Sequence, residues 1–490
     1  MNKKINRINI SPFNRVEGDL EIIVEVKDGK VRNAKSKGVM FRGFEMMLKG
    51  RNPMDAIVFT SRICGICGAS HGLASSKAIR NAWKSKMPEN AYRVKNIVLA
   101  IENLMSHIVH FYALFAPDLT NKKYSSYPGY PELVRRFLPF KGISYLKAIR
   151  ARPSMLELMG VFAGKWPNTL VFQPGGVTCS IDTSRQTKAL GLLRELQNFV
   201  EETLLGCGID RWLENKSLDD LESWLKESHH QDSDLGIYLK SGRELGLDKI
   251  GQGPTRFLSY GVYELPEGGT WLPGGYYDQG FFSFDGQKIA EHIKYSFFEG
   301  YEGGIHPSEG MTQPYVDKKG AYSWAKSPRY DGKVVQVGPL ARMILDKDPL
   351  IYDIFSRWGP SVFLRVLARL HEAVRLVRQV GIWIKEIDER KAFYKKPRVP
   401  TEAKGIGLTE ASRGALGHWI VIKNGKIETY QVVTPSAWNL SPKDSLDQPG
   451  ACEQALIGTM VEDVNNPVEV GHVVRSFDPC LVCSVHMLKK

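Results

Sequence analysis

Apolar side chains alternate with polar ones in the N-terminal part of the chain. They recur at every second position between residues 20 and 26, and an Asp28-Gly29 pair follows. Alternate residues of a strand share one face, and Asp-Gly favours the tight turn between two strands. We therefore expect a β-hairpin within residues 7–40, and a second hairpin around Asn424-Gly425 near the other end of the chain.

Most of the remaining apolar pattern has a helical period. The clearest stripe, with apolar residues three or four positions apart, covers residues 94–112. It predicts a core helix, and we expect the two histidines on or beside it, His107 and His110, to be hydrogen-bonded core residues rather than ligands. A helical pattern also covers residues 54–84, where glycines around two cysteines interrupt it.

Two further amphipathic helices are predicted for residues 188–204 and 361–387. In the second helix the apolar positions form one face, and four arginines are expected on the solvent side: Arg365, Arg369, Arg375 and Arg378. The chain has no internal repeat, low-complexity linker or obvious domain boundary, so a single domain over residues 1–490 is expected.

Composition narrows the class of protein. The 490 residues are 43% hydrophobic and 24% charged, as in a globular protein with ample material for a core. The sequence contains no run of eighteen apolar residues, so no transmembrane helix is predicted. The N-terminus lacks the apolar stretch of a signal peptide. The net charge of +13 comes from scattered basic residues without a nucleic-acid motif. We therefore expect no nucleic acid, and contact with a membrane only through partner proteins.

Two cysteine motifs at opposite ends of the chain carry the candidate chemistry. Each is a Cys-x-x-Cys followed three or four residues later by histidine, within the segments Ser61–His71 and Phe477–His486. The four cysteines are Cys64, Cys67, Cys480 and Cys483. Two such motifs can supply four thiolates to one soft metal site, which is either structural zinc or a catalytic metal.

The residues around these motifs favour a catalytic metal. Structural zinc pairs usually lie about 15–20 residues apart, whereas these pairs lie at the two ends of the chain. Arg62 lies two residues before Cys64 and would offset part of the thiolate charge. Asp478 directly precedes Pro479 and the second motif, and adds a carboxylate that a structural zinc site does not need.

Both segments resemble the signatures of the large subunit of nickel–iron hydrogenases. The pattern Arg-x-Cys-Gly-x-Cys-x-x-x-His stands at residues 62–71, and Asp-Pro-Cys-x-x-Cys-x-x-His stands at residues 478–486. The resemblance extends over nearly the whole chain. It implies an α+β fold with a mainly helical core, an N-terminal β-hairpin layer and a C-terminal α/β segment, in which both cysteine motifs meet at one site.

This resemblance also implies the cofactors. The four cysteines would hold a nickel–iron centre whose iron carries carbonyl and cyanide ligands. Cys64 and Cys480 would bind nickel terminally, Cys67 and Cys483 would bridge nickel to iron, and Ser436 would hydrogen-bond a diatomic ligand of the iron. A magnesium ion would be held by three groups: the carboxylate of Glu45, the side chain of His486 and the backbone carbonyl of Val432.

Further residues receive roles by the same resemblance. Glu17 would relay protons, provided that burial moves its pKa towards neutrality. Arg413 would lie over the metals, where its charge positions the reacting groups, and its use as a base would be costly. A terminal thiolate is a further candidate for the base. His71 would donate a hydrogen bond to a bridging thiolate. Asp118 and Asp478 would fix Arg413 through charge-assisted hydrogen bonds.

The implied reaction is the reversible oxidation of dihydrogen. Dihydrogen is a very weak acid, so it needs a metal to polarise it and a base within hydrogen-bond reach. The chain has no further cysteine cluster, so electrons would pass to a small subunit that carries iron–sulfur clusters, and maturation factors would insert the metals. A dihydrogen sensor with the same ligands stays an open alternative. A metal-free relative, such as a quinone-side subunit of respiratory complexes, lacks the cysteines.

The chain departs from the family pattern in several places, including Lys443 and Cys452 in the C-terminal part. Asn168 stands where related chains often carry His, and Ser412 stands where most carry Pro. Only Met487–Lys490 follows the final histidine, whereas family members are usually made with a longer extension that a protease removes. We expect either cleavage after His486 or maturation without cleavage, and slightly favour the second.

Overall fold

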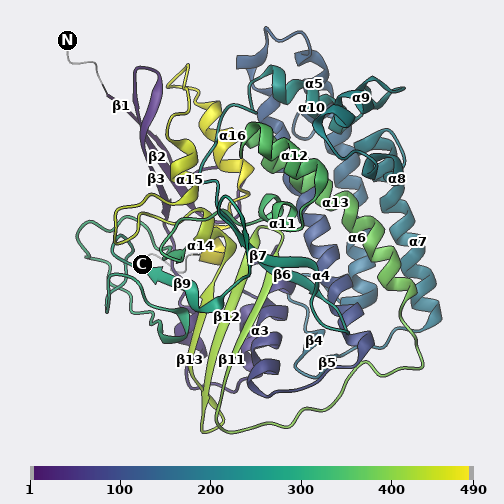
Figure 1. The fold of residues 1–490 in the computed structure, drawn as a ribbon, viewed down its shortest axis with the longest axis vertical. Coiled ribbons are helices and arrows are strands. Elements are labelled where there is room, and N and C mark those ends of the chain that lie inside the picture. The colour runs from purple at the N-terminus through teal and green to yellow at the C-terminus, as the bar shows by residue number, and fades with distance from the viewer. Residues whose placement is uncertain (1–4, 485–490) are drawn as a thin grey trace.

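The computed structural model describes residues 5–484 and has an α+β architecture (Figure 1). Its N-terminal layer is an antiparallel sheet of β1 (Asn6–Ile10), β2 (Leu20–Lys27) and β3 (Lys30–Gly38). The predicted hairpin is confirmed, since β2 and β3 pair across Asp28-Gly29. The alternate apolar residues of β2 are buried, and helix α15 (Ala451–Leu456) packs against β3.

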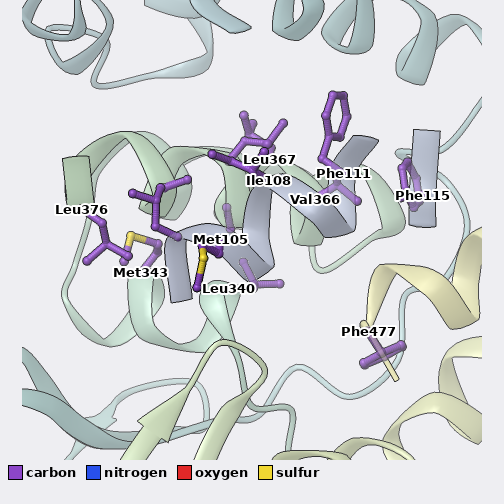
Figure 2. Packing of buried hydrophobic residues seen from close by; sticks show 14 of the residues in the cluster. Met105, Ile108, Phe111, Phe115, Leu340, Met343, Val366, Leu367, Leu376 and Phe477 are labelled. Carbon is purple, nitrogen blue, oxygen red and sulfur yellow. The ribbon is translucent and has the colours of Figure 1, made fainter. Parts of the chain in front are cut away.

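Four long helices form the main core, and Figure 1 shows them on one flank of the molecule. They are α4 (Glu89–Val109), α6 (Ile143–Ala163), α7 (Thr183–Phe199) and α13 (Val362–Lys385). Helix α4 packs on α6 and α13, while α7 packs on α6 and α13. Met105 and Ile108 of α4 lie among Val366, Leu367 and neighbouring apolar side chains (Figure 2). The predicted core helix over residues 94–112 is therefore confirmed.

Helices α4 and α7 both end in a wider turn. α4 continues as a π-helix over His110–Phe115 and a 3₁₀ turn over Ala116–Thr120, and α7 continues as a π-helix over Val200–Leu205. Among the described residues, one helical stretch, Glu89–Thr120, is long and apolar enough to cross a bilayer, but 83% of its most apolar window is buried within the protein. Buried core helices are commonly this long and this apolar.

The prediction that four arginines of α13 face solvent is wrong for two of them. Arg365 and Arg369 are only 5% and 2% exposed, whereas Arg375 is partly exposed and Arg378 is well exposed. The reason is tertiary packing, because α13 is covered by α4, by α7, by α11 (Pro339–Leu345) and by α16 (Val468–Ser476) on different sides. Each buried guanidinium is hydrogen-bonded in the interior.

The C-terminal sheet is built of β11 (Ala403–Ala411), β12 (Gly414–Lys423) and β13 (Lys426–Val433), all antiparallel. The hairpin predicted at Asn424-Gly425 joins the last two strands. Helix α3 (Gly68–Ala82) crosses β11 at very short range. A Cβ at Gly407 would lie only 1.9 Å from a carbonyl oxygen of α3, so only glycine allows this approach.

The helical pattern over residues 54–84 is observed as α2 (Asp55–Thr60) and α3, and the first cysteine motif lies between them. The remaining helices are α1 (Phe44–Leu48), α5 (Tyr130–Phe137), α8 (Ile209–Leu213), α9 (Leu218–Lys226), α10 (Asp234–Glu244), α12 (Pro349–Trp358), α14 (Pro435–Asn439) and α17 (Leu481–Ser484). The remaining strands are β4 (Phe172–Gln173), β5 (Gly176–Val177), β6 (Phe257–Glu264), β7 (Thr270–Tyr277), β8 (Phe281–Phe282), β9 (Ile289–His292) and β10 (Ser327–Tyr330). Short 3₁₀ turns cover Lys122–Tyr124, His230–Asp232, Gly286–Lys288 and Pro307–Glu309.

Candidate metal centre

Four cysteine sulfurs from the two ends of the chain meet in the interior. The Sγ atoms of Cys64 and Cys480 are 3.4 Å apart, and those of Cys67 and Cys483 are 3.2 Å apart. Cys480 and Cys483 are separated by 2.9 Å, and all four sulfurs lie within 4.8 Å of one another. All four residues are buried. Such a compact set of soft donors fits one soft transition-metal site.

The loop before β2 holds the C-terminal cysteine motif in place. The amide of Leu481 donates to the Glu17 carbonyl at 2.7 Å, and the amide of Glu17 donates to the Pro479 carbonyl at 3.2 Å. The next residue, Gly18, has a φ of +79°, and a Cβ there would lie 2.6 Å from the amide nitrogen of Val482. Glycine is therefore required both by the backbone conformation and by the close approach.

Arg42 is the basic residue that links the two cysteine motifs, a role that the sequence did not predict. Its Nη2 donates to the Val482 carbonyl at 2.9 Å and also to the carbonyl of Ile63. Arg62, which we expected to offset the thiolate charge, is exposed and donates to the Val58 carbonyl instead. That expectation is wrong because the turn after α2 directs Arg62 outward. No sequence signal distinguished Arg42 beyond its place three residues before Glu45.

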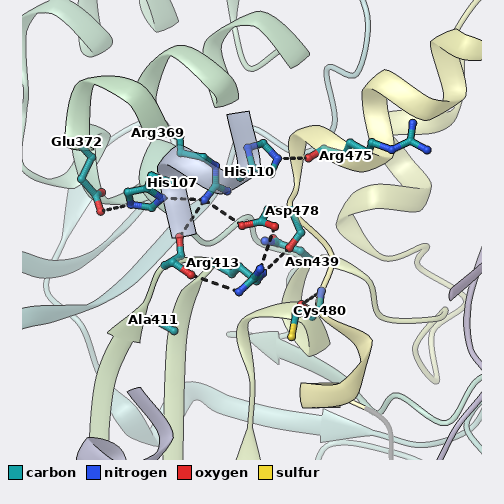
Figure 3. Close-up of polar contacts among 12 residues, drawn as sticks. His107, His110, Arg369, Glu372, Ala411, Arg413, Asn439, Arg475, Asp478 and Cys480 are labelled. Atoms are coloured by element: carbon teal, nitrogen blue, oxygen red, sulfur yellow. Dashed lines mark hydrogen bonds and ion pairs between the residues drawn. The ribbon is translucent and has the colours of Figure 1, made fainter. Parts of the chain in front are cut away.

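Arg413 and Asp478 form the expected pair near the thiols (Figure 3). Arg413 donates from Nε to the Asp478 carbonyl at 2.9 Å and from Nη2 to Asp478 Oδ1 at 3.1 Å. The second carboxylate oxygen lies 3.2 Å from Nη1 of Arg369. Burial opposes ionisation of Asp478, but the two guanidinium groups hold its pKa below the usual value. Ser412 accepts hydrogen bonds from both arginines, through Oγ from Arg413 and through its carbonyl from Arg369.

Asp118 does not contact Arg413, so the expected pairing is wrong. Its carboxylate instead forms ion pairs with Arg475 at 2.6 Å and with Arg15 in the loop before β2. Arg475 also donates to the carbonyl of Asn14. Asp118 therefore fixes the N-terminal loop to α16, and its connection with the thiols runs through the backbone of that loop.

A line of buried charges continues behind Asp478 (Figure 3). Arg369 donates to Nδ1 of His107 at 3.1 Å, and the other ring nitrogen of His107 lies 3.1 Å from Glu372 Oε1. Glu372 in turn forms a bidentate pair with Arg342, with both distances 2.8 Å. His110 donates to the Arg475 backbone carbonyl at 2.7 Å. Both histidines are therefore hydrogen-bonded core residues, as predicted.

Glu17 is the carboxylate whose electrostatics suit proton exchange near the thiols. Its side chain is half-buried. Burial raises the pKa of Glu17, as does the negative charge of Cys64, while Arg413 and Arg42 oppose the shift. A pKa closer to neutral pH allows the carboxyl group both to take up and to release a proton.

His71 lies one helical turn after Cys67 in α3, so the two side chains point to the same face of the helix. Its Nδ1 is 3.1 Å from Nε2 of His418. Its Nε2 is buried and has no hydrogen-bond partner among the described residues. Ser436, in the first turn of α14, accepts a hydrogen bond from the amide of Cys480 at 3.0 Å.

Glu45 lies beside Val432, as the magnesium assignment requires. The contact, however, is from the Val432 amide, which donates to Glu45 Oε1 at 2.8 Å. Thr312 donates to the other oxygen of Glu45, and Lys326 Nζ lies 3.9 Å away. The third expected ligand, His486, and the tail Met487–Lys490 lie outside the described residues.

Comparisons with known proteins identify the family of this chain. A family profile described as nickel-dependent hydrogenase matches residues 42–124 and 142–486. The chain is 35% identical to the periplasmic [NiFeSe] hydrogenase large subunit of Desulfomicrobium baculatum, with 98% of this chain and 95% of the relative covered. It is 31% identical to the uptake hydrogenase large subunit of Rhodobacter capsulatus over the same shares of the two chains.

Solved structures of hydrogenases also match this chain. The reduced, active Ni-Fe-Se hydrogenase of Desulfomicrobium baculatum superposes with a TM-score of 0.85 at 34% identity, covering 98% of this chain and 100% of the other. The Ni-Fe-Se hydrogenase of D. vulgaris Hildenborough gives a TM-score of 0.84 at 32% identity, covering 99% and 100%. The chain therefore belongs to the nickel-dependent hydrogenase family. It is the catalytic large subunit of a hydrogenase, an oxidoreductase that acts on dihydrogen, and a nickel–iron centre fits its four buried thiols.

Proposed function

We propose that the four thiolates hold a nickel–iron centre whose iron carries carbonyl and cyanide ligands, within one domain formed by the whole chain. Cys64 and Cys480 are assigned to nickel alone, and Cys67 and Cys483 to both metals. The observation that carries the proposal is the buried cluster itself, in which each N-terminal sulfur has a C-terminal sulfur within 3.4 Å. When bound, this centre supplies the polarisation that dihydrogen needs in order to split.

Glu17 is proposed as the group that takes and passes on the proton. Its raised pKa and its backbone pairing with the segment around Cys480 support this role. Arg413 keeps its proton at any ordinary pH, so it acts through its charge and position. Asp478 fixes that position from one side, and Asp118 supports the site from further away by fixing the loop that contains Glu17.

Two hydrogen-bonding residues complete the proposed site. His71 is assigned as a donor to a thiolate shared by both metals, because its buried Nε2 has no other partner among the described residues. Ser436 is assigned to a diatomic ligand of the iron. Its hydroxyl accepts from the Cys480 amide, so its own proton is free to be donated.

We also propose a magnesium site at Glu45, with the Val432 carbonyl and His486 as further ligands. A largely buried carboxylate beside the backbone of β13 suits a hard cation that prefers oxygen ligands. Lys326 lies 3.9 Å from Glu45 and would have to remain outside the coordination sphere.

Electrons are proposed to leave through a small subunit with iron–sulfur clusters, and the metals to be inserted by maturation factors. Metal analysis of the purified complex tests the centre. Near-equal nickel and iron at this site are expected, and Cys64→Ser should abolish metal loading and turnover together. The matched control is Cys207→Ser, because Cys207 is half-buried and lies outside the cluster. Zinc alone in an active preparation would refute the proposal.

Glu17→Gln tests the proton route. The amide cannot relay a proton, so the variant should retain nickel and iron but lose dihydrogen turnover and deuterium–hydrogen exchange. Glu21→Gln, which changes a β2 carboxylate paired with Lys37, serves as the control. Unchanged exchange in Glu17→Gln would remove Glu17 from the mechanism. Slow turnover in the unmodified complex, together with a signalling partner, would favour the sensor function instead.

A further inference from the structure

A chain of hydrogen bonds leads away from His71 into the C-terminal sheet. His71 Nδ1 lies 3.1 Å from His418 Nε2, and His418 Nδ1 lies 2.7 Å from the hydroxyl of Tyr430. The three residues come from α3, β12 and β13. Both histidines are fully buried and Tyr430 is 2% exposed. The two rings and the phenol therefore have to satisfy one another without bulk water.

Each histidine carries a single ring proton. Both rings are fully buried, they hydrogen-bond each other and the Tyr430 hydroxyl, and no carboxylate among the described residues contacts either ring, so a second ring proton would be an uncompensated buried charge. With one proton on each ring, the chain of hydrogen bonds has only two possible directions. Either Tyr430 donates to His418 and His418 donates to His71, or both hydrogen bonds run the opposite way.

The groups at the two ends of this series of hydrogen bonds select one direction. At the inner end, His71 Nε2 is buried without a partner among the described residues, and His71 lies one helical turn after Cys67. Metal-bound thiolates accept hydrogen bonds but do not donate them. At the outer end, the Tyr430 hydroxyl lies 2.7 Å from His418 Nδ1 and also interacts with the buried hydroxyl of Ser75. Ser75 can donate to the phenol oxygen, and His418 Nδ1 is then the acceptor for the phenol proton, so Tyr430 donates to His418.

We propose that His418 and Tyr430 are positioning residues that fix the tautomer of His71. Tyr430 donates to His418 Nδ1, which places the His418 proton on Nε2. His418 then donates to His71 Nδ1, which places the His71 proton on Nε2, where it faces the thiolates. The inference rests on the proposed role of His71 and extends it to two residues that touch neither metal nor dihydrogen. The protons stay in place, so this is no route for proton transfer.

Neutron diffraction from hydrogen–deuterium-exchanged crystals of the complete enzyme tests the direction. Deuterons are expected on Tyr430 Oη, His418 Nε2 and His71 Nε2. A deuteron on Nδ1 of His71, or two deuterons on either ring, would overturn the proposal. This measurement reads proton positions in the protein and is separate from metal analysis. An absence of nickel would therefore count against the proposed function and leave the tautomers still measurable.

A variant series tests the consequence. Tyr430→Phe removes only the donor hydroxyl, and we expect turnover at saturating dihydrogen to fall about threefold to tenfold, as for the loss of one ordinary hydrogen bond. The KM and the nickel content should stay unchanged, while the nickel electron paramagnetic resonance spectrum should shift. The matched control is Tyr263→Phe, which removes another buried hydroxyl, one bonded to Asn103 outside the site.

Substitution of His418 separates the tautomer effect from a loss of packing. His418→Gln offers an amide N–H to His71 and a carbonyl oxygen to Tyr430, so it should retain most of the turnover and the spectrum. His418→Leu fills the space without these groups and should shift both. Equal behaviour of the two variants, or of Tyr430→Phe and Tyr263→Phe, would overturn the proposal.

Discussion

The variant Arg369→Gln tests whether Arg369 is exposed, as the helical pattern of the sequence predicts, or buried, as the structure shows. The amphipathic pattern of α13 places Arg369 in solvent, where substitution would change the free energy of unfolding by no more than about 0.5 kcal/mol. In the structure its guanidinium is 2% exposed and lies 3.2 Å from Asp478 Oδ2. Two unit charges about 4 Å apart interact by about 4 kcal/mol at an effective dielectric constant near 20.

Removal of one partner from a buried ion pair typically costs about 3–5 kcal/mol. Asp478 keeps its contacts with Arg413 in the variant, so we expect a loss near the lower end, about 3 kcal/mol. Equilibrium urea unfolding of the purified chain measures this quantity. The control is Arg378→Gln in the same helix, where the side chain is 58% exposed. Equal unfolding free energies for the two variants would refute the assignment of Arg369 to the buried network.

Two further changes test other parts of the site. Gly18→Ala would bring a Cβ to 2.6 Å from the Val482 amide nitrogen at a φ of +79°, so we expect about 1–3 kcal/mol of destabilisation and reduced nickel loading. Urea unfolding and metal analysis measure these effects, and full nickel loading would show that the close approach of this loop is not needed. His472→Gln tests pH dependence. Burial lowers the pKa of His472 to about 4, so the stability it contributes is present above pH 6.5 and is lost as the pH falls towards 4, by up to about 3 kcal/mol. Urea unfolding at pH 7 and pH 4.5 should show a smaller loss for the variant than for the unmodified chain, and equal losses would count against the burial argument.

Local patterns predicted most of the secondary structure. The β2–β3 hairpin and the β12–β13 hairpin each depend on a two-residue turn within a run of strand residues, and α4 depends on a long helical stripe. In each case neighbours in the sequence decide the outcome. The same holds for the four cysteines, because their spacing and flanking residues marked them before any fold was known.

Contacts between distant segments were not predictable in this way. A stripe of apolar residues shows which face of α13 is most apolar, but it does not reveal that His107, Ser412 and Asp478 surround the buried Arg369. Asp118 illustrates the same limit. Its partners, Arg15 and Arg475, lie about 100 and more than 350 residues away, and nothing local distinguishes them from other arginines.

The convergence of the two chain ends has a consequence for how the centre forms. Closing a loop of about 400 residues between Cys67 and Cys480 costs about 5 kcal/mol in chain entropy if nothing else is folded. The two backbone hydrogen bonds that join Glu17 to Pro479 and to Leu481 contribute about 1 kcal/mol each, which does not offset that cost alone. The two motifs come close to each other once the helical core and the C-terminal sheet have formed. The cluster of four thiols is therefore a product of the complete fold, and a partly folded chain presents two separate pairs that lack the geometry to hold the centre.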